Sequence, residues 1–240
     1  MSDEFSVEAL GAQSGLPGPR GNLTLLDRFA DHCTVEQAQR CLDVLRDDTA
    51  NSPEEFVGMC GVLGRAMLLR GDLGQAFVHL RPFMSHSSWR IRESTAIAIQ
   101  KLGEGRLGEV FGFLEPLAEG NAYERRAVVA GLCEPRLLDR PEWNLKVLDL
   151  LTRITATLDH DDPLTDAEVS LRKALGYGWS VAVSRSPEPG KPAFEALLSL
   201  PGKHVLWVVR ENLKKDRLVR LDPEWLARLT ARLSVLGKEA

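Results

Sequence analysis

The chain has 240 residues, of which 44% are hydrophobic and 27% are charged, and its formal net charge at pH 7 is −4. This composition is typical of a folded protein and excludes a chain that is disordered throughout. No apolar run reaches the ~18 residues that a membrane-spanning helix needs, and the first residues lack the basic and apolar regions of a signal peptide. We therefore expect a cytoplasmic protein that does not enter a membrane.

The charge is distributed unevenly along the sequence. Residues 1–60 contain 11 acidic and 4 basic side chains, whereas residues 203–240 contain 5 acidic and 9 basic ones. A chain whose two ends carry net charges of opposite sign can orient a charged partner. Two solvated surfaces can also carry opposite net charges without any function. Both interpretations stay open at the level of the sequence.

We expect two parts in the chain. Residues 1–21 form an N-terminal segment that ends in a loop, because residues 11–21 contain four glycines and two prolines. Residues 22–240 are expected to form a single helical domain.

Helix signals begin directly after this loop. Apolar residues at spacings of three and four predict helices over residues 23–30 and 35–45, the second of them capped by Thr34. Ser52, followed by Pro53 and two glutamates, has the pattern of the next helix start.

The most informative feature of the sequence is an internal repeat, in which residues 107–131 match residues 73–97 at an offset of 34 without a gap. The matched positions are Leu73/Leu107, Gly74/Gly108, Phe77/Phe111, Leu80/Leu114, Pro82/Pro116, Trp89/Tyr123, Arg92/Arg126 and Ala96/Ala130. A period of this length is typical of helical repeat proteins, in which each unit buries its apolar side against its neighbours.

The repeat predicts helix pairs for the remainder of the chain. The expected helices are 73–84, 89–102, 107–118, 123–132, 166–183, 192–200 and 204–213, followed by a last helix that begins at Asp222. Residues 140–166 fit the period poorly and are expected to hold an inserted or degenerate helix. Residues 204–209 are β-branched and aromatic and predict a strand by propensity alone. The repeat places them at the start of a second helix, and we prefer that prediction because packing overrides propensity.

The aligned second helices share a column of four arginines: Arg92, Arg126, Arg172 and Arg210. Three of them follow an aliphatic residue, and an alanine stands four positions after the first two. This pattern resembles the HEAT repeat, whose second helix commonly opens with Asp-x-x-Val-Arg-x-x-Ala, although the aspartate is missing before the first two arginines. The resemblance covers roughly residues 70–215 and implies an all-α fold, an α-solenoid in which HEAT-like helix pairs form a right-handed superhelix.

The arginine column has two interpretations. The arginines either tie neighbouring repeats together through carboxylates and carbonyls, or form a basic row about 30 Å long, since packed helices lie ~8–10 Å apart. Arg217 would extend such a row, and tryptophans would be able to stack on bases or sugars, although aromatic residues at helical spacing more often lie in a core. The candidate residues for binding a partner or nucleic acid are Trp89, Arg90, Arg92, Arg125, Arg126, Arg172, Lys173, Trp179, Trp207, Arg210, Lys214 and Lys215.

Patterns that suggest catalysis are weak. Ser180 stands in a Gly-x-Ser-x-Ala sequence, but no strand precedes it, as a nucleophile elbow requires. Asp159–Asp162 offers carboxylates and a histidine to a metal, yet adjacent residues rarely converge on one ion, and a solvated loop is expected. The four cysteines form no Cys-x-x-Cys pair and are expected to be reduced, buried thiols. We expect no catalytic residue, no metal and no cofactor.

A second, distant resemblance concerns an enzyme group built on the same kind of repeat. The HEAT-like DNA alkylation repair glycosylases hold damaged duplex in a concave groove. Lys173-Ala174-Leu175-Gly176-Tyr177 is similar to a short stretch of that group, with the tyrosine where a tryptophan is usual. The expected arginine three residues later is replaced by Ser180, and no catalytic aspartate can be assigned to a position in this chain.

We predict a non-catalytic HEAT-repeat scaffold that engages a protein partner through its concave face. The alternative is a nucleic-acid-binding or DNA-repair member of the same superfamily, against which the overall acidity of the chain argues. A third interpretation is a small-ligand or metal-dependent enzyme built on residues 159–185.

Overall fold

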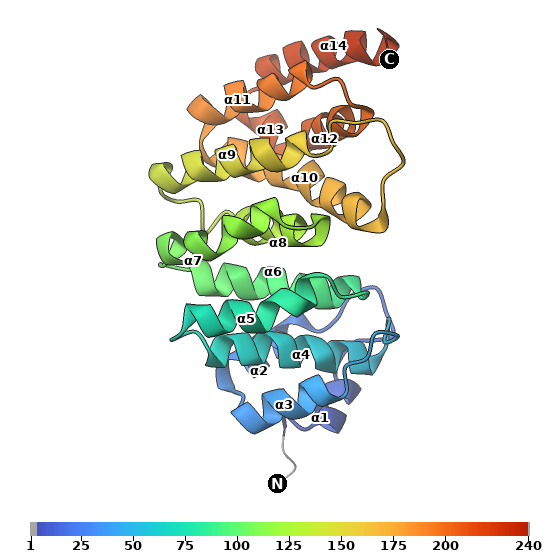
Figure 1. Ribbon diagram of the computed structural model, residues 1–240, viewed down its shortest axis with the longest axis vertical. Coiled ribbons are helices and arrows are strands. Elements are labelled where there is room, and N and C mark those ends of the chain that lie inside the picture. Colours follow the sequence, from blue (N-terminus) through green and yellow to red (C-terminus); the bar gives the residue numbers. More distant parts are fainter. Residues whose placement is uncertain (1–3, 240) are drawn as a thin grey trace. The chain divides into compact units, whose positions relative to one another are not determined.

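A computed structural model gives the fold and describes residues 4–239 (Figure 1). Every regular element in this range is a helix, with fourteen α-helices and two short 3-10 helices, so the predicted all-α class is confirmed. None of the described helices combines the length and the apolar character needed to cross a membrane. The packing contacts divide the chain into two compact units, Met1–Arg106 and Leu107–Ala240.

Unit 1 is organised around α4 (Pro53–Leu68), which is buried along most of its length because five helices pack against it. Those helices are α1 (Val7–Ala12), α2 (Leu23–His32), α3 (Val35–Asp43), α5 (Leu73–Met84) and α6 (Trp89–Gly103). The ribbons of α4, α5 and α6 form successive layers in Figure 1. The N-terminal segment belongs to this core, since Leu10 of α1 is fully buried.

Two helix starts in unit 1 follow the predicted capping chemistry. Thr34 forms a capping box with Gln37 at the start of α3, and the Ser52 hydroxyl accepts from the backbone N–H of Glu55 at 3.3 Å. Pro53 is the first residue of α4, where its missing N–H costs nothing. Both predicted starts are confirmed.

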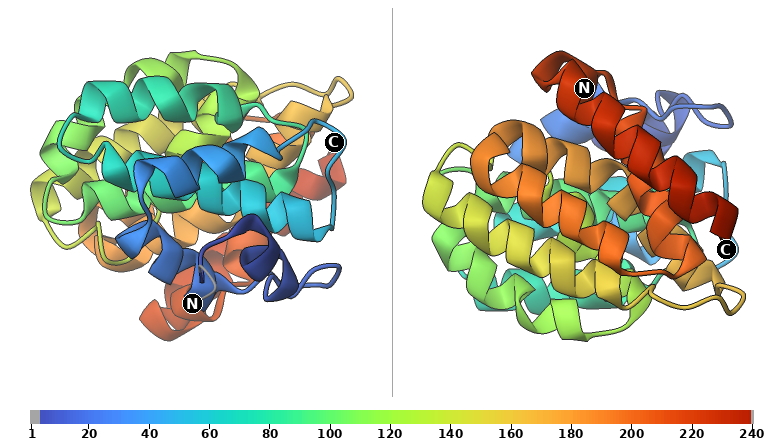
Figure 2. Two further views of the ribbon diagram at one scale, coloured as in Figure 1. Left: turned by 90° about the horizontal axis from the view of Figure 1, so that it is seen from below. Right: turned by 90° about the horizontal axis from the view of Figure 1, so that it is seen from above.

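Unit 2 is organised around α10 (Asp166–Arg185), the longest helix of the described chain. Its packing partners are α8 (Ala122–Leu132), α9 (Pro141–Ala156), α11 (Pro187–Ala196), α12 (Lys203–Leu213) and α13 (Asp216–Leu221). The other elements are α7 (Leu107–Leu114), η1 (Pro116–Glu119), η2 (Leu197–Ser199) and α14 (Pro223–Glu239). In Figure 2 (right), α9 and α11 run side by side, and α14, drawn in dark red, runs diagonally across this end of unit 2.

The two copies of the repeat differ in their first helix. In the first copy α5 continues through Pro82 to Met84, whereas in the second copy α7 ends at Leu114 and Pro116 begins the 3-10 helix η1. The prediction of one helix over residues 107–118 is therefore wrong for residues 115–118. Proline lacks an N–H and its ring clashes with the preceding turn, so a helix that meets proline commonly ends there.

Three other sequence predictions are settled in unit 2. The poorly fitting stretch holds a regular helix, α9, followed by a long loop up to α10. Residues 204–209 lie in α12, which confirms the helix that the repeat favoured over the strand. The helix expected from Pro192 begins earlier, at Pro187, and Pro192 lies inside it.

The cysteines are free and buried, as expected for reduced thiols. Burial raises the pKa of Cys33 to about 11 and that of Cys133 to about 12. Both side chains are therefore neutral thiols at physiological pH and behave as small apolar core residues.

Candidate binding face

Arg90 of unit 1 lies in a buried ion-pair network. Its Nη1 is 3.0 Å from Oε2 of Glu55, and its Nη2 donates to the carbonyl oxygen of Gly18 at 2.8 Å. Glu55, which is 1% exposed, also accepts from the Ser88 hydroxyl at 2.5 Å and from the backbone N–H of Asn51 at 2.8 Å. The guanidinium thus fastens the loop before α2 to the first turns of α4 and α6.

The neighbouring column residue, Arg92, is also buried. Its Nη1 donates to the carbonyl oxygens of His86 at 2.5 Å and Ser87 at 2.7 Å, which closes the turn between α5 and α6. Trp89 at the start of α6 is 54% exposed, and the Arg90 guanidinium stacks 4.6 Å from its ring centroid. These contacts favour the internal role for both arginines, because their guanidinium groups are directed at backbone and carboxylate oxygens of unit 1.

The predicted residues on α8 of unit 2 are half-buried. Arg125 donates from Nε to the carbonyl oxygen of Ala118 in η1 at 3.1 Å, so it links α8 to the preceding 3-10 helix. Arg126 lies beside it on the same helix.

The seam between α10 and α12 brings together several predicted residues. The Arg172 guanidinium stacks 4.4 Å from the ring centroid of Trp207, and its Nη1 is 3.1 Å from Nδ1 of His204. Trp207 lies directly over Gly176, because a Cβ added to this glycine would be 2.9 Å from Cζ3 of the indole. The absent side chain at Gly176 is therefore what lets Trp207 pack this closely against α10.

A second stacked pair lies one turn further along α10. Tyr177 is 44% exposed, and the Arg217 guanidinium of α13 stacks 4.6 Å from its ring centroid while donating to its hydroxyl at 2.9 Å. Lys173 lies four residues before Tyr177, and its side chain is exposed. Residues at this spacing share one side of a helix.

Arg210 of α12 and Lys214, the residue that caps the end of this helix, lie three and seven residues after Trp207 and are exposed. Lys214 pairs with Glu211 at 2.5 Å, whereas neither Lys173 nor Arg210 has a side-chain partner within residues 4–239. The exposed and half-buried residues of α10, α13 and the C-terminal part of α12 with its cap thus form one surface, which we call the basic–aromatic face. Its members are the exposed Lys173, Tyr177, Arg210 and Lys214 and the half-buried Trp207 and Arg217.

Comparison of the chain with protein-family models, curated proteins and solved structures found no match.

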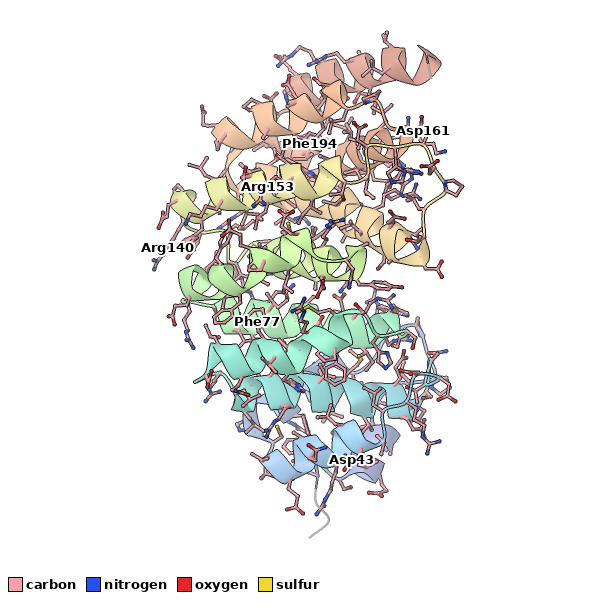
Figure 3. All side chains as sticks on the ribbon, in the orientation of Figure 1. Asp43, Phe77, Arg140, Arg153, Asp161 and Phe194 are labelled. Atoms are coloured by element: carbon pink, nitrogen blue, oxygen red, sulfur yellow. The ribbon has the colours of Figure 1, made fainter. Side chains whose placement is uncertain are left out.

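The loop between α9 and α10 covers the start of α12. Oδ1 of Asp159 accepts from the backbone N–H of Gly202 at 2.7 Å, and Oδ1 of Asp161 accepts from that of Lys203 at 2.9 Å. Figure 3 shows Asp161 in this loop, close to α12. Gly202 is necessary here, because a Cβ would lie 2.7 Å from the backbone nitrogen of His160. The two carboxylates thus cap α12 and neutralise the positive end of its dipole.

This capping bears on the metal interpretation of Asp159–Asp162. Within residues 4–239, no three His, Cys, Asp or Glu side chains are grouped so that they would hold a metal ion. The carboxylates of Asp159 and Asp161 accept from backbone N–H groups instead.

The rings of His204 and of His160, a residue of the loop, lie together at the start of α12. Nε2 of His204 is 2.8 Å from the carbonyl oxygen of Asp162, and its ring packs edge-on against that of His160 at 5.3 Å between centroids. Nε2 of His160 lies 3.8 Å from Oε1 of Glu168. The pKa of Glu168 is lowered, first by the backbone N–H and then by the hydroxyl of Thr165, with smaller contributions from the two histidines.

Trp179 and Ser180, by contrast, are fully buried. The indole N–H of Trp179 donates to the Thr155 hydroxyl at 2.9 Å, and its ring packs against that of Phe194 at 5.6 Å between centroids. The Ser180 hydroxyl donates to the carbonyl oxygen of Tyr177 at 2.7 Å, within its own helix. The buried Trp179 ring is not available for stacking on a ligand in this conformation, and the Ser180 hydroxyl is not presented as a nucleophile.

The four column residues do not share one environment, since Arg92 is buried, Arg126 and Arg172 are half-buried, and Arg210 is exposed. Lys215 is half-buried at the start of α13. The prediction did not select His204, whose partner Arg172 lies 32 residues earlier in the chain. It also did not place Tyr177 in a binding set, although the four-residue spacing from Lys173 is a signal that would have found it.

Proposed function

We propose that the chain is a non-catalytic, cytoplasmic scaffold of HEAT-like helix pairs stacked as a right-handed solenoid, and that its basic–aromatic face binds an acidic segment of a protein partner. The observation that carries this proposal is the arrangement on α10, α12 and α13. Two exposed cations without partners in the described chain, Lys173 and Arg210, lie on the same face as two arginine-stacked aromatic rings.

The chemistry of this face suits protein recognition. Arginine, tyrosine and tryptophan are the side chains that most often dominate binding energy at protein interfaces. Stacking on Arg172 and Arg217 holds both rings in place before binding, so little side-chain entropy remains to be lost. The surrounding cations favour a partner rich in carboxylates and would steer its approach.

An acidic protein segment fits better than nucleic acid. Glu211 stands among the cations of the face, and the whole chain has a net charge of −4 and a pI near 5.8. Arg90 and Arg92 would have lengthened a basic row, but their guanidinium groups donate to oxygen atoms inside unit 1. Proteins that bind nucleic acid usually neutralise several phosphates and carry an excess of basic residues.

The candidate catalytic groups form hydrogen bonds within the chain, and these bonds support a scaffold rather than an enzyme. Ser180 is bonded within α10, and Asp159 and Asp161 cap α12.

The test measures binding of fluorescein-labelled poly-aspartate to the full-length chain at low and moderate salt. The double variant Lys173→Glu/Arg210→Glu reverses the two unpaired charges. We expect its affinity to fall by roughly ten-fold or more, since each reversal removes an attraction of up to ~1 kcal/mol and adds a repulsion. The matched control, Arg140→Glu/Arg228→Glu, makes the same charge change at exposed positions in elements outside the face and should bind much more strongly than the test variant.

Three outcomes would overturn the proposal. Poly-aspartate fails to bind at low salt, or the test and control variants weaken binding equally. In the third outcome, a duplex DNA of mixed sequence binds more tightly than poly-aspartate and depends on the same two residues, in which case the nucleic-acid alternative replaces the protein partner.

A further inference from the structure

The hydrogen bonds of His204 define its protonation state. A carbonyl oxygen only accepts, so Nε2, at 2.8 Å from the Asp162 oxygen, must carry a proton. A guanidinium only donates, so Nδ1, at 3.1 Å from Nη1 of Arg172, must be unprotonated. The observed geometry is therefore that of a neutral imidazole in the Nε2–H form.

Protonation of His204 is incompatible with this arrangement. A proton on Nδ1 would place two donors face to face and two positive charges about one hydrogen-bond length apart. The Arg172–His204 contact would then be repulsive, whereas the bond from Nε2 to Asp162 would remain. The same guanidinium stacks on Trp207, so the contact joins a titratable group directly to the basic–aromatic face.

The other charged groups around His204 come from three elements. From α10, Glu168 lies beside His160 and interacts electrostatically with both histidines. From the loop, His160 packs against the ring. Lys203 of α12 precedes His204 and is tied to Asp161 through its backbone N–H and its Nζ. Glu168 is the negative group that would accommodate a proton on either histidine, and the 5.3 Å ring separation disfavours charging both together.

We propose that His204 is a pH-sensitive latch on Arg172. When His204 is neutral, it holds the guanidinium against the seam between α10 and α12. When His204 is protonated, it releases Nη1 of Arg172, while the guanidinium stays stacked on Trp207, and the freed donor makes the basic–aromatic face bind an acidic segment more tightly. The consequence for binding rests on the proposed function, whereas the latch itself is a property of the His204–Arg172 pair.

The binding test compares the affinity of the full-length chain for poly-aspartate at about pH 8 and about pH 5.5, a range in which histidine titrates and aspartate stays ionised. We expect the wild-type chain to bind roughly two- to five-fold more tightly at the lower pH, as one released charge would give. His204→Gln should remove this dependence, because the amide can donate to Asp162 and accept from Arg172 without titrating. His32→Gln, at an exposed position in unit 1, is the matched control and should keep the wild-type dependence.

A spectroscopic test reads the latch without any ligand. In 15N NMR spectra of the full-length chain, assigned with Arg172→Lys and His204→Gln, the Arg172 Nε–H signal should shift with the same midpoint as the imidazole nitrogens of His204. His160→Gln should leave that coupling in place.

The outcomes separate the two proposals. If poly-aspartate fails to bind at either pH while the Arg172 signal follows His204, the proposed function fails and the latch stands. If the Arg172 signal does not respond when His204 titrates, or if His204 stays neutral throughout the range, the latch is wrong. It is equally wrong if His204→Gln retains the full pH dependence of binding.

Discussion

Glu55 is the residue on which the buried charge network of unit 1 depends. Its carboxylate accepts from Arg90, Ser88 and Asn51, and Arg90 is only 6% exposed. Glu55→Ala would leave a buried guanidinium without its counter-ion. We expect the free energy of unfolding to fall by about 3–5 kcal/mol, measured by urea denaturation of the full-length chain.

The control for this substitution is the adjacent residue. Glu54→Ala removes an exposed carboxylate from the same turn of α4 and should have a much smaller effect. Glu55→Ala combined with Arg90→Met should recover part of the loss, because no unpaired charge then remains buried. Equal losses for Glu54→Ala and Glu55→Ala would show that the network does not stabilise the fold.

The same network shows why residue roles were only partly predictable. Alignment of the repeat placed Arg92 in a column and Arg90 beside it, but their partners were not part of that pattern. Arg90 reaches Glu55 across 35 residues and Gly18 across 72. Local spacing predicts which residues share a helix face, whereas the partner of a buried charge is set by contacts between elements distant in sequence.

At the scale of elements, Gly176 controls how closely α10 and α12 approach. An alanine Cβ there would lie 2.9 Å from Trp207 and 3.3 Å from the Cβ of Glu211, so the indole must move. We expect Gly176→Ala to weaken poly-aspartate binding several-fold by disturbing the Arg172–Trp207 stack. Its effect on the free energy of unfolding should be small, because alanine gains ~1 kcal/mol of helix propensity that offsets the strain.

Gly112 in α7 provides the matched substitution. A Cβ at this position would meet no atom within 4 Å. Gly112→Ala should therefore raise the free energy of unfolding by up to ~1 kcal/mol and leave binding unchanged. If Gly176→Ala binds poly-aspartate as tightly as Gly112→Ala, the position of Trp207 does not matter for recognition.

The elements themselves were largely predictable, and the failures have physical causes. The repeat correctly predicted α12 as a helix, although residues 204–209 favour a strand by propensity. The helix forms because packing buries the apolar side chains of these residues on one side of it. It failed at Pro116 because the matched proline, Pro82, is tolerated close to the end of α5. It also missed that α11 continues through Pro192, since proline near the start of a helix can signal either a beginning or an early turn.

At the scale of the whole molecule, the sequence predicted the positive net charge of the C-terminal part but not the surface on which the basic side chains gather. Residues 203–240 supply Arg210, Lys214 and Arg217, whereas Lys173 and Tyr177 come from α10, outside the basic stretch. Packing of α10 against α12 and α13 brings these groups together. The number of charges along the sequence does not predict which helices pack together, so it did not predict this face.

Acidification should lower the free energy of unfolding of the chain at pH values where its carboxylates are still ionised. Burial lowers the pKa of His79 and of His86 below their unfolded value near 6.5. As the pH falls through 6.5, the unfolded chain binds protons that the folded chain does not, so the free energy of unfolding decreases. The lowered pKa values of Glu54, Glu168 and Asp222 act in the same direction, but only below about pH 4.5.

The measurement is the urea midpoint of the full-length chain across this range. The midpoint should be constant above neutral pH and decline below about pH 6.5. His79 contributes through its ring, which lies 3.0 Å from the carbonyl oxygen of Val62 and packs edge-on against Phe83. His79→Gln keeps an N–H donor for that carbonyl without titrating, so its midpoint should decline less than that of His32→Gln. A wild-type midpoint that rises on acidification would contradict the prediction, because the histidines would then be stabilised in their charged form.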